Sequence, residues 1–224
     1  TSHLGTGAIR ELLRANRTLG ALIALSTVDL LLARHYLPAA DAGAYALGSV
    51  FSKVVMWGTQ FLALGIVPAL HPSDSRKRVI EASAMVGLIG GISIAVTWWQ
   101  APLLVRIVGG SGYGHTEGIL VWFVVLGTLL GLAQVLLYAG MATDDGRLGL
   151  LTWAATAGLV AVVIAGQHSH AYRILATALV ATALVVVLGL ISVVRRPATR
   201  LSEDEAAHPL SEFAPVVGGD PLLD

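Results

Sequence analysis

The chain has 224 residues, of which 55% are apolar and only 12% are charged, and its mean hydropathy is +0.76. A water-soluble domain needs a larger polar share to cover its surface, so this composition excludes that class and indicates a membrane protein. Fourteen Lys and Arg balance fourteen Asp and Glu, which leaves no net positive charge for binding nucleic acid. Cysteine is absent, and this excludes disulfides, thiolate nucleophiles and cysteine metal sites.

Six segments are apolar enough to span a hydrocarbon core of ~30 Å, which takes about 20 residues of helix. They are residues 18–37, 45–70, 79–99, 119–141, 148–165 and 172–194. Asp29, Arg34 and His35 interrupt the first segment, and the fifth is short but rich in Val and Ala. The sequence therefore predicts an all-α fold, a polytopic membrane bundle of six transmembrane helices.

Basic side chains are divided unevenly between the two sides that alternating spans would create. Ten lie on one side and three, Arg34, Arg106 and Arg173, on the other. The ten are Arg10, Arg14, Arg17, Arg76, Lys77, Arg78, Arg147, Arg195, Arg196 and Arg200. By the positive-inside rule, we expect a multi-pass protein of the cell (inner) membrane with both termini in the cytoplasm. The Ala-, Val- and Gly-rich composition suits a bacterial protein.

Three regions follow along the chain. Residues 1–17 place Ile9, Leu12 and Leu13 opposite a row of arginines, which predicts a cytoplasmic amphipathic lead-in helix. An ordinary charged start of the first span is the alternative. Residues 18–194 form the transmembrane lobe. Residues 195–224 are rich in Pro and acidic side chains, and we expect a flexible cytoplasmic tail.

Two pairs of glycines have the spacing that allows close helix packing in membranes. Gly87 with Gly91 lies in the third span, and Gly127 with Gly131 lies in the fourth. We interpret both pairs as packing positions within the bundle rather than as a dimer face.

No catalytic, cofactor or metal signature is present, so we do not expect an enzyme. His115 with Glu117 lacks the paired cysteines of a zinc deaminase, and His168 with His170 reads as a solvated pair in a polar loop. The acidic pair at 144–145 is the best remaining candidate for a metal-phosphate site of a membrane enzyme acting on lipid-linked sugars.

Two ionisable residues fall within the spans, where an unpaired charge costs several kcal/mol. Asp29 lies eight residues before Leu37 and Lys53 eight after Tyr45. With a turn between Leu37 and Tyr45, each lies ~12 Å deep at 1.5 Å per residue. The two could neutralise each other and set the register of one helical hairpin.

A polar cavity is the other interpretation of these charges. Ser49, Lys53, Trp57 and Gln60 recur on one helical stripe, and a cation beside an indole and an amide suits a phosphate or a sugar. Arg34 is nearer the outer surface, where an arginine also reaches the headgroups. The candidate substrate-binding residues are Asp29, Arg34, Lys53, Trp57 and Gln60.

Several short motifs carry a family resemblance. They are Val28-Asp29, Leu32-Ala33-Arg34, Tyr36-Leu37, the Ala42-Gly43-Ala44-Tyr45-Ala46 turn, Lys53, Pro68, and Pro102-Leu103-Leu104 followed by residues 109–113. Together they resemble the second half of the polysaccharide repeat-unit flippases of the multidrug/oligosaccharidyl-lipid/polysaccharide exporter superfamily. In that family the stretch from Pro102 would be an outer loop.

The resemblance implies one lobe of a two-lobed transporter that moves lipid-linked oligosaccharide by alternating access, consistent with repeat-built transporters. The implied partners are the lipid bilayer, a lipid-linked sugar and an N-terminal lobe of the same protein. The family's cavity charges correspond here to Asp29 and Lys53, with Arg34 a weaker match. A non-catalytic membrane subunit or scaffold is the main alternative.

Overall fold

The structure, a computed structural model, describes residues 3–66, 75–109, 117–142, 147–166 and 169–195. These residues form six α-helices and no strand, which confirms the predicted all-α fold. The helices are α1 His3–Tyr36, α2 Ala39–Ile66, α3 Ser75–Gly109, α4 Glu117–Ala142, α5 Arg147–Ile164 and α6 Ala171–Arg195.

Five of the six described helices, all except α2, are long and apolar enough to cross a membrane. Helix α2 has 28 residues, which is also long enough to span, and it carries Lys53 in its middle. A multi-pass membrane helix bundle is therefore confirmed, with five helices meeting the requirement where six spans were expected.

The first hairpin is tighter than its sequence suggested. Leu37 donates its N–H to the carbonyl of Ala33, and Ala42 donates to the carbonyl of Pro38. Pro38 directly precedes the first helical residue, where its missing N–H is not needed because the first N–H groups of a helix have no partner within it. Helix α2 thus begins at Ala39, and the expected turn at residues 42–46 is helical, which corrects that prediction.

The ends of α1 and α3 also differ from the expected segments. Helix α1 runs without a break from His3, so the lead-in segment and the first span form one helix. Helix α3 continues through Pro102 to Gly109, so the expected outer loop is helical as far as Gly109, and its residues 110–113 lie outside the described part of the chain. Residues 196–224, the expected tail, lie outside the described part of the chain.

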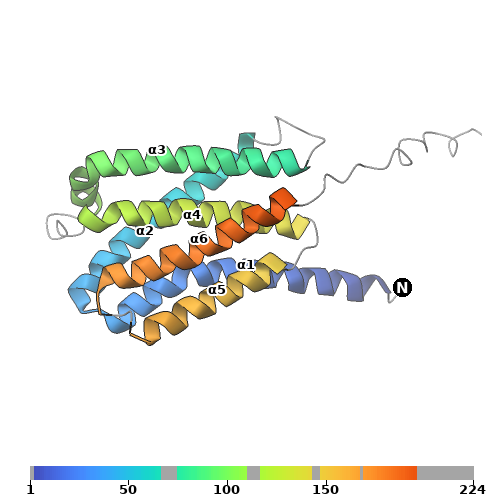
Figure 1. Ribbon diagram of the computed structural model, residues 1–224, viewed down its shortest axis with the longest axis horizontal. Helices are drawn as coiled ribbons and strands as arrows, with labels where there is room; N and C mark the ends of the chain where they lie inside the picture. Colours follow the sequence, from blue (N-terminus) through green and yellow to red (C-terminus); the bar gives the residue numbers. More distant parts are fainter. Residues whose placement is uncertain (1–2, 67–74, 110–116, 143–146, 167–168, 196–224) are drawn as a thin grey trace, which may run out of the picture.

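Helix α4 occupies the centre of the bundle. It packs mainly against α2 and α3 on one side and α6 on the other, while α1 lies against α5 (Figure 1). In the most apolar stretch of α4, 61% of the residues are buried, whereas the share is 11% for α3, which lies at the rim of the bundle. The described chain starts and ends at the same end of the molecule, because α1 begins where α6 ends (Figure 1).

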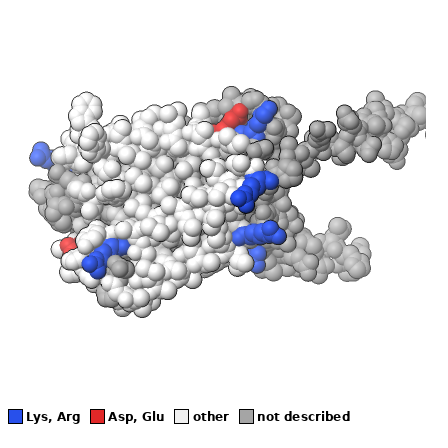
Figure 2. Space-filling view, in the orientation of Figure 1, with Lys and Arg blue, Asp and Glu red and all other residues white. Residues whose placement is uncertain are grey.

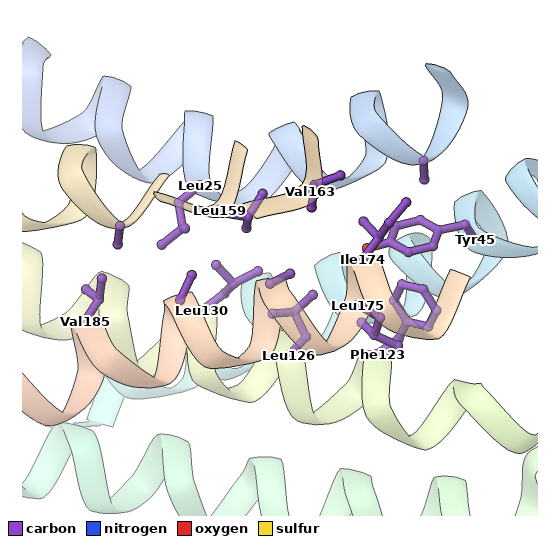
Figure 3. Packing of buried hydrophobic residues seen from close by; sticks show 14 of the residues in the cluster. Leu25, Tyr45, Phe123, Leu126, Leu130, Leu159, Val163, Ile174, Leu175 and Val185 are labelled. Carbon is purple, nitrogen blue, oxygen red and sulfur yellow. The ribbon is translucent and has the colours of Figure 1, made fainter. Parts of the chain in front are cut away.

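The core joins α1, α2, α4, α5 and α6. Tyr45 of α2 and Phe123 of α4 meet edge to face with ring centroids 4.8 Å apart, beside Ile174 of α6 (Figure 3). Such aromatic pairs contribute about 0.5–1.5 kcal/mol beyond their buried area. This contact fixes the first turns of α2 against the centre of the bundle.

The surface matches a membrane protein. On the face seen in Figure 2, Lys and Arg gather at the two ends, and a broad uncharged belt separates them. The belt exposes many large apolar side chains, including Leu31, Leu88 and Val180. An apolar surface of this extent suits contact with lipid rather than water.

Candidate functional site

The candidate site lies where α1 and α2 face each other. Asp29 of α1 is only 3% exposed. The hydroxyl of Tyr45, from the second turn of α2, donates to its Oδ2 at 2.9 Å. Its Oδ1 has no hydrogen-bond partner. Asp29 therefore joins α1 to α2 inside the core and presents no surface to a ligand in this conformation.

Lys53 lies on the same pair of helices and is half-buried. Its Nζ donates to the backbone carbonyl of Ser26 at 2.6 Å. This carbonyl is one turn away from Asp29, and the ammonium contacts it in place of the carboxylate. An ammonium has three N–H donors, so two remain for another acceptor.

The expected equal depth of Asp29 and Lys53 is wrong, and the hairpin explains why. Because α2 begins at Ala39, Lys53 is fourteen residues into it, or ~21 Å at 1.5 Å per residue. Asp29 is eight residues before Leu37, or ~12 Å. Tyr45 lies opposite Asp29 instead, and Lys53 lies deeper. The direct Asp–Lys pair that would set the hairpin register does not form.

The other candidate residues separate along the helices. Trp57 is 48% exposed one turn beyond Lys53, and Ser49 is buried one turn before it. The side chain of Gln60 lies outside the described part of the structure. Arg34 is exposed in the last turn of α1, well away from Lys53. Lys53 and Trp57 therefore remain together as the open part of the predicted stripe.

Comparison with known proteins identified no relative of this chain. No family model, curated protein or solved structure matches the chain. The flippase resemblance thus rests on its short motifs, two of which are helical here rather than a turn and a loop.

Sequence reasoning missed Tyr45 as the partner of Asp29. The available signal was Pro38, which places a helix start directly after it and puts Tyr45 within two turns. Ser26 could not be found in this way, because its backbone carbonyl, rather than its side chain, accepts from Lys53. A backbone acceptor leaves no trace in residue type.

Among the described residues, a second, partly buried polar contact lies within α4. Gln134 donates its Nε2 to the hydroxyl of Tyr138 on the same helix. Within the described residues, no group of three His, Asp or Glu could hold a metal. The pairs at 144–145 and 115–117 are not fully described, and His168 also lies outside the described residues.

The side chains at the α1–α2 face are suited to binding a ligand rather than to catalysis. Lys53 supplies a cation with free donors, and Trp57 supplies an exposed aromatic face one turn away. An anion or a sugar is the ligand that these groups suit.

Proposed function

We propose that the chain is one lobe of a two-lobed transporter that moves lipid-linked oligosaccharide or polysaccharide precursors across the cell membrane by alternating access. The observation that carries the proposal is the position of Lys53. It lies fourteen residues after Ala39 and thirteen before Ile66, at the midpoint of α2, and the residue is only half-buried. Transporter binding sites commonly lie near the bilayer midplane.

A charge at this depth is costly unless it is paired. Insertion of a lysine at the centre of a membrane helix costs about 2.5–3.5 kcal/mol. The hydrogen bond to the Ser26 carbonyl offsets about 1.5–3 kcal/mol of that cost, and the nearby Asp29 side chain adds an electrostatic attraction. These contacts still leave two of the three N–H donors of the ammonium without an acceptor, and this supports a role in binding.

The ligand class follows from the chemistry at the α1–α2 face. The two remaining N–H donors of Lys53 suit the phosphates of a lipid-linked sugar diphosphate. Trp57 lies one turn away with an exposed indole that can stack on a sugar ring. A lipid-linked substrate would reach this face from the bilayer, which the apolar surface of the bundle contacts.

Asp29 takes a different part in this proposal. Its hydrogen bond to Tyr45 holds the start of α2 against α1. This contact sets the register of the two helices, and with it the position of Lys53 beside the Ser26 carbonyl. We therefore assign Asp29 to positioning and Lys53 to substrate contact. The second lobe would face α1 and α2 and complete the cavity.

The decisive experiment replaces Lys53 with Met in the full-length protein. Transport of a fluorescent lipid-linked sugar diphosphate is measured in proteoliposomes, with protein abundance matched. We expect a roughly ten- to hundredfold loss, because hydrogen bonds to charged groups contribute about 1.5–3 kcal/mol. Lys53→Arg should keep part of the rate, and Val54→Ala, on the neighbouring exposed position, should keep all of it.

Two outcomes would count against the proposal. Full transport by Lys53→Met at equal abundance would remove the lysine from substrate binding. Loss of abundance without loss of specific rate would favour the alternative, a non-catalytic membrane subunit in which Lys53 serves only to hold α2 against α1. The intrachain bond to Ser26 is the observation in favour of that alternative.

A further inference from the structure

Helix α3 is too long for a straight membrane span. Its first described basic side chain, Lys77, lies 21 residues before Trp98, a rise of ~32 Å that matches a hydrocarbon core of ~30 Å. Eleven more residues follow from Trp98 to Gly109, or ~16 Å of further helix. These last turns must lie outside the span or turn aside from it.

An aromatic belt marks the boundary at this level. Trp98 and Trp99 are 79% and 81% exposed, and they lie in the last third of α3, which runs toward the end of the molecule opposite to both ends of the described chain (Figure 1). Trp122, near the start of α4, and Tyr172, near the start of α6, are also exposed at that end. Exposed Trp and Tyr gather where a membrane protein meets the headgroups.

Beyond the belt, α3 changes direction. Pro102 lies inside the helix, where it removes one backbone hydrogen bond and kinks the axis. The last turns of α3 bend toward α4 at that end (Figure 1). Ala101 and Val105 pack there on Leu120 of α4, with Leu47 and Phe51 of α2 beside them.

The opposite face of these turns is apolar with one charge. Leu103 and Ile107 are exposed there, and Arg106 is exposed beside them. In water this face would leave a contiguous apolar patch uncovered, and deep in hydrocarbon Arg106 would be costly. The headgroup boundary suits both, because apolar side chains reach the acyl chains while the guanidinium reaches the phosphates.

We propose that residues 100–109 form an interfacial helical segment, embedded in the headgroup boundary of the leaflet at the Trp98 end. Leu103 and Ile107 insert among the upper acyl carbons, and Arg106 binds lipid phosphates. The occupant of this face is the bilayer surface itself. The proposal does not depend on transport, because it uses only α3 and its neighbours.

The absence of cysteine allows a direct test. Single variants Leu103→Cys and Ile107→Cys of the full chain are labelled with bimane and reconstituted in phosphatidylcholine vesicles. Quenching is compared for lipids brominated near the headgroup and near the acyl-chain ends. Leu88→Cys, lipid-facing and ten residues before Trp98, is the matched deep control.

We expect quenching at positions 103 and 107 to be stronger with the shallow bromines than with the deep ones, and the reverse at position 88. Three results would overturn the proposal. Strong quenching by aqueous iodide without lipid quenching would place the segment in water. A deep-dominated profile would place it in the span. Protection from both kinds of quencher would show that protein covers the face.

Discussion

Two glycine pairs with the same spacing occupy opposite environments in this bundle. In α4, a Cβ on Gly127 would overlap the carbonyl oxygen of Ser52, and one on Gly131 would lie 2.8 Å from the hydroxyl of Thr59. In α3, a Cβ on Gly87 or Gly91 would meet nothing within 4 Å. Only the α4 pair is used to bring two helices together.

The difference shows that two glycines four residues apart permit close approach of another helix but do not determine whether one packs there. Helix α4 lies at the centre of the bundle, and its glycine pair lets the backbone of α2 come into contact with it. Helix α3 lies at the rim, and its Gly87 and Gly91 are on the side that points away from the bundle. On α3 the close contact uses Gly90, over the side chain of Thr128. The expectation that both pairs pack within the bundle is thus correct for α4 and wrong for α3.

The largest effect is expected for Gly127→Ala. Its new Cβ would meet backbone atoms of Ser52, which cannot rotate away, so α2 and α4 must separate. We expect a loss of unfolding free energy of about 3 kcal/mol, the upper part of the usual range for overpacking. Equilibrium unfolding in mixed detergent micelles measures it. A variant as stable as the parent would show that α2 is not held at this distance.

A smaller effect is expected for Tyr45→Phe. The change keeps the ring on Phe123 but removes the hydroxyl that donates to Asp29. Since a buried acceptor then loses its partner, we expect about 1–2 kcal/mol less stability in the same unfolding assay. Asp29→Leu combined with Tyr45→Phe should cost less than the sum of the single changes. Strict additivity of the two would argue against their coupling.

Much of this fold could be predicted from hydropathy. The expected spans at residues 119–141, 148–165 and 172–194 match α4, α5 and α6 within two residues at each end. Apart from a few charges near their ends, these helices are apolar throughout, so the edge of the apolar segment is also the edge of the helix.

The first hairpin and the end of α3 could not be predicted in the same way. Residues 39–44 are small and only weakly apolar, so hydropathy placed a turn where Pro38 in fact starts a helix. Pro102 suggested a loop, but the contacts of Ala101 and Val105 with Leu120 keep the helix intact across it. Tertiary packing decides both cases, and it leaves no periodic trace in the sequence.

The wrong start predicted for α2 also affects the candidate site. Because α2 starts six residues before Tyr45, Lys53 lies nearly two helical turns deeper than a start at Tyr45 would place it. The prediction that Asp29 and Lys53 lie on two neighbouring helices agrees with their places on α1 and α2. Their partners, Tyr45 and the Ser26 carbonyl, depend on the register of α1 against α2 and required the structure.

The smallest effect is expected for the double variant Gly87→Ala, Gly91→Ala, the matched counterpart of Gly127→Ala. Nothing lies within 4 Å of either new Cβ, and alanine is the better helix former, so stability should stay equal or rise by up to about 1 kcal/mol per site. The measurement is repeated in detergent and in lipid vesicles with the full-length protein. A clear loss of stability in vesicles but not in detergent would mean that this face of α3 packs against another helix in the bilayer and does not face lipid.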